Sequence, residues 1–377
     1  SIVMNEFNDL YQTDPARLAR PDVQALTPYQ SARRIAAAAG IHGDVWLNAN
    51  ESSDADAMAP LESFFNRYPE PQPEAVVKAY AAYAGLNEDQ VLVTRGGDEG
   101  IELFVRTFCH PGEDAVLQFP PTYGMYSVSA QTNGAEVINL VTRPEDNWTP
   151  NAEATREMPE KCPDIKVVFA CSPGNPTGSL IPSDVLEALA KATLGRAILV
   201  IDEAYIEFAP ETTAVGLLAK YPHVALIRTL SKAFALAGLR CGFVLSSPDV
   251  INVLKKVIAP YPIPTPTADI AAQALSPEGI ERMRRRATDC VARRDVLRAA
   301  LAQLPGVQNV VASNSNFLLV KFHEADRIFT ALRAQGIILR DQSRQPTLEN
   351  CIRVTIGTDP ENERLLATLN ALLTETR

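Results

Sequence analysis

Short apolar runs alternate with amphipathic stretches through the middle of the chain, and this alternation predicts its secondary structure. Seven runs have the length and the branched side chains of buried strands: Val91–Thr94, Ala115–Phe119, Glu136–Val141, Lys166–Cys171, Ala197–Ile201, Val224–Thr229 and Cys241–Ser246. Apolar residues recur at helical spacing in Glu74–Ala84, Gly97–Phe108, Ser183–Ala192 and Pro248–Ile258. Buried strands separated by helices predict an α/β fold, with a mostly parallel seven-stranded sheet covered by helices on both faces.

The pattern changes near residue 276 and predicts a second, smaller α/β unit. A long charged helix is expected over Pro277–Gln303, followed by strands at Asn316–Phe322, Ile337–Arg340 and Cys351–Ile356 and helices at Glu324–Gln335 and Pro360–Thr374. We therefore expect an N-terminal arm that begins the small domain (1–45), a large domain (46–275) and a small C-terminal domain (276–377). The proline-rich link Ala259–Pro266 is expected to lack regular structure.

Arginines gather near the start of the long helix, at Arg282, Arg284, Arg285 and Arg286. They could form an anion site, but the pattern favours a solvated helix face.

Composition excludes several classes of protein. The chain has 377 residues, 46% of them hydrophobic, and a net charge of -10, which disfavours a nucleic-acid-binding surface but leaves room for a local basic pocket. No apolar run approaches the roughly 20 residues of a membrane span, and the N-terminus lacks the basic-then-apolar pattern of a signal peptide. The six cysteines and four histidines show no metal-ligand spacing, so we expect free thiols, no metal site and a cytoplasmic protein.

A lysine follows the predicted strand Val224–Thr229 within Thr229–Phe234. Burying a lysine beside a core strand is costly, whereas a lysine condensed with an aldehyde avoids much of that cost and serves as a nucleophile and base. A strand-end lysine that reaches to bulk water is the alternative. Lys232 alone does not decide between these interpretations.

Three further motifs also follow predicted strands. Asp202 and Tyr205 stand at the carboxyl end of a strand, where parallel sheets bind ligands and where an aspartate could hold a pyridine nitrogen protonated; a helix-capping aspartate is the alternative. Asn175 lies between two prolines in a turn and could donate to a ligand oxygen. The turn at Gly97 and Asp98 places backbone amides at a helix N-terminus, which suits a phosphate. Together with the lysine, these motifs predict an aldehyde cofactor that carries a phosphate.

The stretch Thr229–Gly238 (TLSKAFALAG) resembles the lysine signature of fold-type I aminotransferases, and specifically that of the histidinol-phosphate aminotransferase family. Similar stretches are Leu26–Arg34, Trp46–Glu51, Tyr68–Pro73, Pro120–Tyr126, Asp202–Phe208, Gly336–Asp341 and Cys351–Gly357. They extend over essentially the whole chain after residue 15. The resemblance implies the fold-type I architecture, pyridoxal 5'-phosphate as the cofactor, and a homodimer with shared active sites.

The resemblance also implies catalytic roles. Lys232 would hold the cofactor as a Schiff base and transfer protons, and Asp202 would face the pyridine nitrogen. Tyr205 and Asn175 would hold the phenolic oxygen, while Tyr123 would stack on the ring.

Further residues receive binding roles by the same resemblance. The cofactor phosphate would be bound by Thr229, Ser231, Arg240, the backbone around Gly97 and Asp98, and Tyr68 of the other subunit. The substrates would be bound by Tyr29, Asn50, Arg340 and Arg353.

The reaction implied is transamination of L-histidinol phosphate with 2-oxoglutarate, giving 3-(imidazol-4-yl)-2-oxopropyl phosphate and L-glutamate in L-histidine biosynthesis. Within enzymes, the alternatives are a pyridoxal-phosphate decarboxylase of threonine phosphate and a broad aromatic aminotransferase. Outside enzymes, the alternative is an aminotransferase-like regulatory module with an added DNA-binding segment, for which we expect no room before residue 15.

Overall fold

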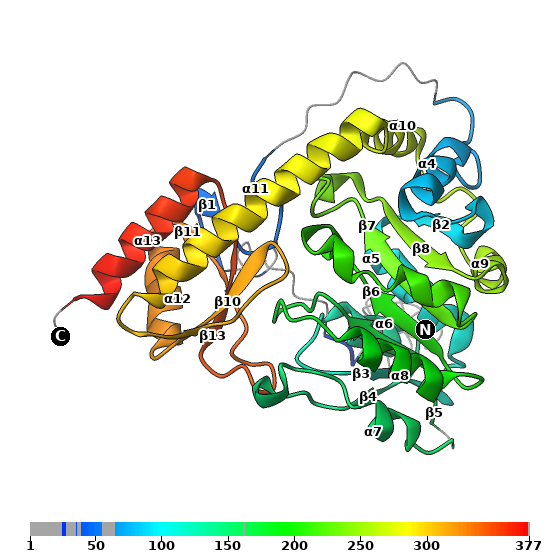
Figure 1. The fold of residues 1–377 in the computed structure, drawn as a ribbon, viewed down its shortest axis with the longest axis horizontal. Helices are drawn as coiled ribbons and strands as arrows, with labels where there is room; N and C mark the ends of the chain where they lie inside the picture. Colours follow the sequence, from blue (N-terminus) through cyan, green and yellow to red (C-terminus); the bar gives the residue numbers. More distant parts are fainter. Residues whose placement is uncertain (1–24, 28–34, 36–38, 55–64, 161–162, 376–377) are drawn as a thin grey trace, which may run out of the picture.

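The computed structural model describes residues 25–27, 35, 39–54, 65–160 and 163–375, and its largest feature is a seven-stranded sheet of order β2-β8-β7-β6-β5-β3-β4 (Figure 1). The strands are β2 (Val91–Thr94), β3 (Asp114–Gln118), β4 (Glu136–Asn139), β5 (Asp164–Cys171), β6 (Ile198–Asp202), β7 (Val224–Thr229) and β8 (Gly242–Ser246). β8 runs opposite to its neighbours β2 and β7, and all the other pairings in the sheet are parallel. The predicted mostly parallel sheet is therefore confirmed.

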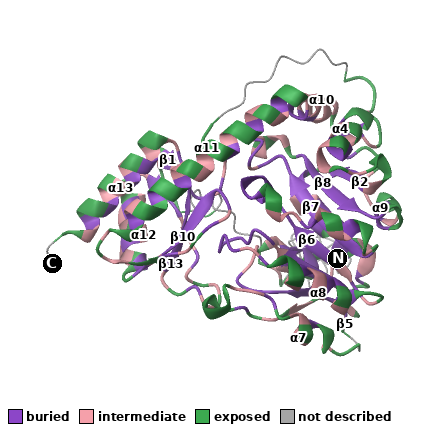
Figure 2. Ribbon diagram, in the orientation of Figure 1, coloured by how far each residue is buried: buried purple, intermediate pink, exposed green. Residues whose placement is uncertain are grey.

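Helices cover both faces of this sheet, as the continuous apolar strands predict. One face carries α4 (Glu74–Ala84), α8 (Ser183–Thr193), α10 (Thr265–Ala274) and the start of α11 (Pro277–Ala302). The other face carries α5 (Gly96–Phe108), α6 (Met125–Thr132) and α9 (Pro248–Lys255). Figure 2 shows the strands as the buried layer between helices whose outer faces are exposed.

Side chains alternate along β6 as the pleat requires. Leu199 and Ile201 pack into the core beneath α4 and α8, whereas Val200 packs into the core beneath α5 and α6. The same alternation directs Asp202, the last residue of β6, toward the α5 and α6 side. The sheet thus delivers a carboxylate to its carboxyl edge on a chosen face.

Helix starts follow local capping chemistry. Ser276 accepts a hydrogen bond from the Gly279 amide at the start of α11, which satisfies one of the unpaired donors of the first turn. The expectation that Ala259–Pro266 is irregular holds only as far as Pro264, because Thr265 and Pro266 begin α10. Proline is compatible with a first helical turn, where its missing N–H costs nothing.

A second sheet of four strands has the order β12-β13-β10-β9. Its strands are β9 (Val307–Val310), β10 (Phe317–Phe322), β12 (Arg340–Asp341) and β13 (Cys351–Thr355), and it packs against α11, α12 (Ala325–Ala334) and α13 (Asp359–Leu373). The single strand expected over Ile337–Arg340 is wrong. Its first part, β11 (Ile337–Ile338), pairs with β1 (Val45–Trp46) instead, and the buried Leu339 separates it from β12.

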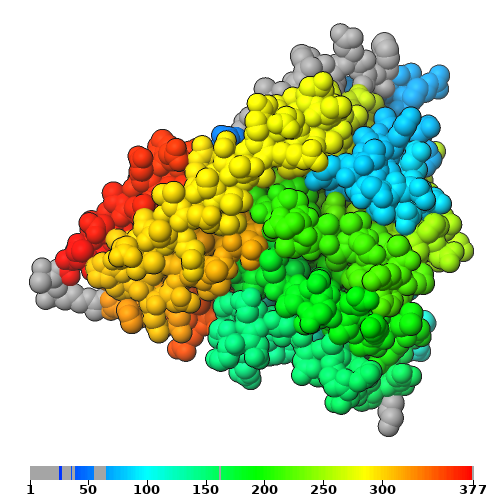
Figure 3. All heavy atoms as spheres, viewed as in Figure 1, coloured from blue at the N-terminus to red at the C-terminus, as the bar shows by residue number. Residues whose placement is uncertain are grey.

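Helix α11 joins the two sheets (Figures 1 and 3). It packs on the large sheet through Met283 and Ala287 and on the small sheet through Leu297 and Leu301. Of the predicted solvated arginines, Arg284 and Arg285 are exposed. Arg286 departs from that expectation, because it donates to the carbonyl oxygen of Ala233 at 3.1 Å. Ala233 directly follows Lys232, the predicted Schiff-base lysine. No described helix is long and apolar enough to cross a membrane.

Candidate active site

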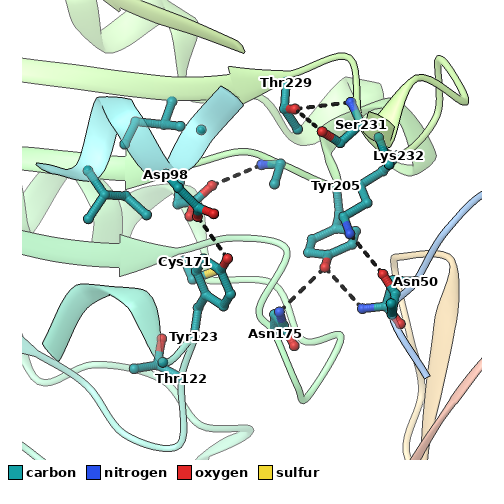
Figure 4. A pocket seen from close by; sticks show the side chains of 18 of the residues that line it. Asn50, Asp98, Thr122, Tyr123, Cys171, Asn175, Tyr205, Thr229, Ser231 and Lys232 are labelled. Atoms are coloured by element: carbon teal, nitrogen blue, oxygen red, sulfur yellow. Dashed lines mark hydrogen bonds between the residues drawn. The ribbon is translucent and has the colours of Figure 1, made fainter. Parts of the chain in front are cut away.

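A cavity of about 410 Å³ lies at the carboxyl ends of β5, β6 and β7 and is closed on one side by the small sheet. This volume is in the range of small-molecule sites. Its lining includes these residues that the sequence analysis selected: Asn50, Gly97, Asp98, Tyr123, Asn175, Asp202, Tyr205, Thr229, Ser231, Lys232, Arg240, Arg340 and Arg353. The tertiary structure therefore brings thirteen of the fifteen predicted site residues to one cavity, and Figure 4 labels several of them, among them Tyr205 and Lys232.

Lys232 stands in the turn after β7, and its amine ends inside the cavity. The Nζ atom donates to the Ala49 carbonyl oxygen at 3.0 Å and lies 5.9 Å from the centre of the Tyr205 ring. Burial, assisted by the Arg353 guanidinium, lowers the pKa of Lys232 to about 8, because both disfavour the charged form. Such an amine is partly neutral near neutral pH and can act as a nucleophile or a base.

Asp202 is buried at the carboxyl end of β6. Its Oδ2 atom accepts a hydrogen bond from the Tyr126 hydroxyl at 2.6 Å, and its Oδ1 atom accepts one from the Ala204 amide at 3.1 Å. Burial raises the pKa of Asp202 to about 6, while these two donors act in the opposite direction. The carboxylate is thus poised to meet a cationic partner in the cavity.

Tyr205 receives two amide donors on its hydroxyl oxygen. Asn50 Nδ2 donates at 3.0 Å and Asn175 Nδ2 at 3.4 Å. The amides are held in this orientation because their carbonyl oxygens accept from Thr355 Oγ1 and from Arg353 Nη1. With both of its acceptor positions used, the tyrosine hydroxyl keeps its own hydrogen for a ligand.

Arg353 links the small sheet to the strand ends. Its Nη1 atom donates to Asn175 Oδ1 at 2.8 Å and its Nη2 atom to the Asn48 carbonyl oxygen at 3.0 Å. The guanidinium also lies 5.6 Å from the centre of the Phe317 ring. Arg340 pairs with Arg353 across the β12–β13 ladder, so the two side chains project from the same face of the small sheet.

The hydroxyls of Thr229 and Ser231 form a local pair. Thr229 Oγ1 donates to Ser231 Oγ at 2.8 Å and accepts from the Ser231 amide at 3.0 Å. The Ser231 hydroxyl hydrogen therefore remains available to an acceptor in the cavity.

The N-terminus of α5 lies beside this pair and supplies backbone amides. Gly96 has a φ of +78°, and an added Cβ there would overlap the Arg240 guanidinium. A Cβ on Gly242 of β8 would lie 2.6 Å from the Gly96 carbonyl carbon and 2.7 Å from the Gly97 amide nitrogen. Helix amides, the hydroxyls and Arg240 together could hold an anion.

Tyr123 is anchored over the cavity. Its hydroxyl donates to Asp98 Oδ1 at 2.8 Å, and its ring meets the Tyr126 ring edge to face with centroids 5.7 Å apart. Figure 4 shows Tyr123 on the side of the cavity opposite Lys232.

Two predicted site residues are not part of the described cavity. Tyr68 is 81% exposed, and its ring stacks on that of Tyr261 with centroids 4.6 Å apart. Tyr29 lies outside the described residues.

The sequence analysis missed Tyr126, Gly242, Gln342 and Gln345. Tyr126 is fully buried and acts through Asp202, so no motif of its own marks it. Gly242 is needed for a backbone approach that only the folded chain reveals. Gln342, which directly follows β12, and Gln345, in the turn after it, line the cavity from a polar segment whose sequence is ordinary turn chemistry. Among the described residues, no group of His, Cys, Asp or Glu side chains could hold a metal ion.

The chain is similar to aminotransferases over most of its length. The model for aminotransferase class I and II matches residues 44–369. The chain is 54% identical over 354 residues to histidinol-phosphate aminotransferase of Shigella sonnei, which covers 94% of this chain and 97% of that protein. The chain thus belongs to the histidinol-phosphate aminotransferase family within that class.

Solved structures agree on the fold. Histidinol-phosphate aminotransferase from Sinorhizobium meliloti in complex with pyridoxal-5'-phosphate has a TM-score of 0.82 at 23% identity, covering 94% of this chain and 97% of its own. L-threonine-O-3-phosphate decarboxylase from Porphyromonas gingivalis has a TM-score of 0.73 at 17% identity, covering 88% and 100%. Because both share the architecture, the fold-type I prediction is confirmed, but the fold alone does not separate transamination from decarboxylation.

Proposed function

We propose that this protein transfers the amino group of L-histidinol phosphate to 2-oxoglutarate, giving 3-(imidazol-4-yl)-2-oxopropyl phosphate and L-glutamate in L-histidine biosynthesis. The observation that carries the proposal is one cavity in which a lysine of lowered pKa, a buried carboxylate, an anion site and two arginines converge. Membership in the family at 54% identity supports this substrate over threonine phosphate or a broad set of aromatic amines.

The cavity fits pyridoxal 5'-phosphate in the chemistry of its donors and acceptors. Asp202 would pair with the protonated pyridine nitrogen, and the free hydroxyl hydrogen of Tyr205 would meet the phenolic oxygen. Ser231, Arg240 and the α5 amides would hold the phosphate. When bound, this cofactor supplies an aldehyde for amines and a ring that accepts electrons.

Lys232 would provide the covalent anchor and afterwards the base. Its Nζ atom would take the proton from the α-carbon of the substrate, a positioned transfer that contributes about 10² to 10⁴ in rate. The pKa of about 8 suits this role, because a neutral amine must be available near physiological pH. Asp202 would keep the ring nitrogen charged by remaining ionised.

Arg340 and Arg353 would bind the anionic ends of both substrates. A guanidinium fork is permanently charged and binds phosphate or carboxylate oxygens in pairs. Arg353 is already held by Asn175 and the Asn48 carbonyl, so its orientation is set before a ligand arrives. Tyr29 would close over the substrate, and Tyr123 would stack on the cofactor ring.

A homodimer with shared sites is also part of the proposal, as is the division into an arm (1–45), a large domain (46–275) and a small domain (276–377). The exposed, stacked pair Tyr68 and Tyr261 supports a partner contact, with Tyr68 reaching the partner's cofactor phosphate. Mixing inactive Lys232→Ala and weakened Tyr68→Ala subunits tests it, because each mixed dimer regains one intact site. Failure to regain activity in verified mixed dimers would oppose shared sites.

A cytoplasmic location stays a prediction.

The decisive experiment mixes the yellow holoenzyme with L-histidinol phosphate alone and follows the visible spectrum. We expect the holoenzyme band to disappear, pyridoxamine phosphate to form, and 2-oxoglutarate to reverse the change. These ping-pong half-reactions are typical of a covalent carrier. An unchanged spectrum with histidinol phosphate, but a response to phenylalanine, would replace the substrate. Carbon dioxide release from threonine phosphate without use of 2-oxoglutarate would replace the reaction.

A further inference from the structure

A chain of hydrogen bonds crosses from the large sheet to the small one beside the proposed substrate arginines. The Thr122 amide, which precedes α6, donates to Gln345 Oε1 at 3.0 Å. Gln345 Nε2 then donates to Gln342 Oε1 at 3.0 Å. All three residues line the cavity.

This chain determines the orientation of both side-chain amides. A backbone N–H can only donate, so the atom of Gln345 that faces Thr122 must be its carbonyl oxygen. The amide nitrogen of Gln345 consequently faces Gln342 and must meet the oxygen of that side chain. Gln342 is left with Nε2 as its unused end, and no described residue accepts a hydrogen bond from it.

The strand geometry places this donor with the arginines. Gln342 continues the β12–β13 ladder, since its amide donates to the Cys351 carbonyl oxygen at 3.0 Å. Residues two apart on a strand share a face, so Gln342 projects on the same side as Arg340. Arg353 pairs with Arg340 across the ladder and therefore projects on that side too. The intervening Asp341 faces away and accepts from Ser343.

We propose that Gln342 is a specificity-determining residue that donates a hydrogen bond from Nε2 to the phosphate group of the amine substrate. A ligand group that meets an amide N–H₂ and a guanidinium on one face must offer several acceptor oxygens. A phosphate does so on a tetrahedral centre, which lets it bind both donors at once. The imidazole end of the substrate has no such set of acceptors.

The hydrogen bonds from Thr122 to Gln345 and from Gln345 to Gln342, which we call the relay, connect the proposed phosphate contact to the packing of the small sheet against the large one. Thr122 belongs to the large sheet's loops, whereas Gln342 and Gln345 belong to the small sheet. A second bridge reinforces it, because Trp148 Nε1 donates to Thr347 Oγ1 at 3.2 Å in the same loop. The relay therefore orients Nε2 of Gln342 only while the Thr122 loop and the small sheet are in contact.

The test uses Gln342→Glu, with Gln308→Glu as the matched control. The new carboxylate keeps an oxygen for Gln345 Nε2 but replaces the donor by an acceptor, so the relay survives while the proposed phosphate contact is lost. Gln308 is exposed on β9 and receives the same charge change. The measured quantity is the ratio of kcat/KM for L-histidinol phosphate to kcat/KM for L-histidinol, which lacks the phosphate.

We expect this ratio to fall roughly 10- to 100-fold in Gln342→Glu, as when a hydrogen bond to a charged group is lost, and to stay at the wild-type value in Gln308→Glu. Binding of L-histidinol phosphate to borohydride-reduced holoenzyme, measured by calorimetry, should weaken by a similar factor. Gln345→Ala should lower the ratio less, about three-fold, because it frees the amide of Gln342 without removing it.

An unchanged ratio in Gln342→Glu, or equal losses on both amines, would overturn the assignment. Should Gln342→Glu fold poorly, Gln342→Met provides the same comparison without an added charge. The inference rests on the proposed function, and the two fail differently. A wild-type enzyme that does not act on L-histidinol phosphate refutes the function, whereas an active one that tolerates Gln342→Glu refutes only the phosphate contact.

Discussion

The two walls of the active-site cavity are built in different ways. The wall at the strand ends of the large sheet carries Asp202, the last residue of β6, together with Asn175 and Lys232 in the turns that follow β5 and β7. The wall of the small sheet carries Arg340, Gln342 and Arg353, which project from one face of a β-ladder. The first wall holds the groups suited to the cofactor, and the second holds donors suited to anionic substrates.

The difference shows where chemistry and specificity reside. Groups on the first wall are buried and have shifted pKa values, as Asp202 and Lys232 illustrate. Groups on the second wall are hydrogen-bond donors whose value lies in their orientation. Changes to the first wall should therefore affect cofactor binding and rate, and changes to the second should affect discrimination between substrates.

The largest effect is expected from Lys232→Ala. Loss of the only amine placed to anchor the cofactor and move the α-proton within the described cavity should lower turnover by roughly 10⁴-fold or more. The thermal unfolding midpoint should change little, because the lysine is not part of a core cluster. Steady-state kinetics and calorimetry measure the two quantities, with the exposed Lys256→Ala as control. Near-normal turnover would refute the assigned mechanism.

Asp202→Ala should rank second. Without the carboxylate that is proposed to pair with the ring nitrogen, the cofactor should bind poorly and most activity should be lost, by about 10²- to 10³-fold on the scale of a lost electrostatic contact. Titration of the apo-protein with cofactor measures the affinity directly. Asp184→Asn, an exposed carboxylate removed elsewhere, is the control. Unchanged affinity and kinetics would remove the proposed role of Asp202.

Arg353→Lys tests the second wall. A single ammonium cannot reproduce a planar fork that bonds both Asn175 and the Asn48 carbonyl, so the binding of an anionic substrate by the small-sheet wall should weaken. We expect kcat/KM for L-histidinol phosphate to fall about 10- to 100-fold, mainly through KM. The exposed Arg344→Lys should behave as wild type. If the loss falls on cofactor affinity instead, the division between the walls is wrong.

Tyr126→Phe should give the smallest effect and the most specific one. Tyr126 donates to Asp202, so its loss should raise the pKa of Asp202 above the present value of about 6. In its proposed role Asp202 pairs with the cofactor only when ionised, so the cofactor affinity of the apo-protein should rise with pH through that pKa. In the variant, the rise in cofactor affinity should occur about one pH unit higher than in wild type. At pH 8 the affinity should be near normal.

The other groups around Asp202 remain in place in this variant, namely Asp98, Cys171, Glu203 and Tyr205. The pH profile of cofactor affinity, measured by fluorescence titration, therefore reports on the lost hydroxyl. Tyr221→Phe removes a hydroxyl that donates to Glu187 and should leave the profile unchanged. A uniform loss of affinity at every pH would mean that Tyr126 is only a packing residue.

The order of residues along the chain is enough to predict the elements and most of the first wall. Strands such as Val91–Thr94 and Val224–Thr229 have the predicted bounds, because strands buried on both faces leave continuous apolar runs. The carboxyl ends of such strands meet at one edge, so the pattern of residues alone places Asp202 and Lys232 together. The roles of these residues still stand as proposals.

The position of the second wall, and the hydrogen bonds that orient the side chains of both walls, depend on the tertiary structure. The split of Ile337–Arg340 between two sheets depends on pairing with Val45–Trp46, a partner near the other end of the chain, which local periodicity cannot indicate. The Tyr126 contact with Asp202 and the Thr122–Gln345–Gln342 relay are hydrogen bonds between distant segments. Local propensity and spacing predict elements and strand ends, but the orientation of a side chain depends on neighbours that only the tertiary structure supplies.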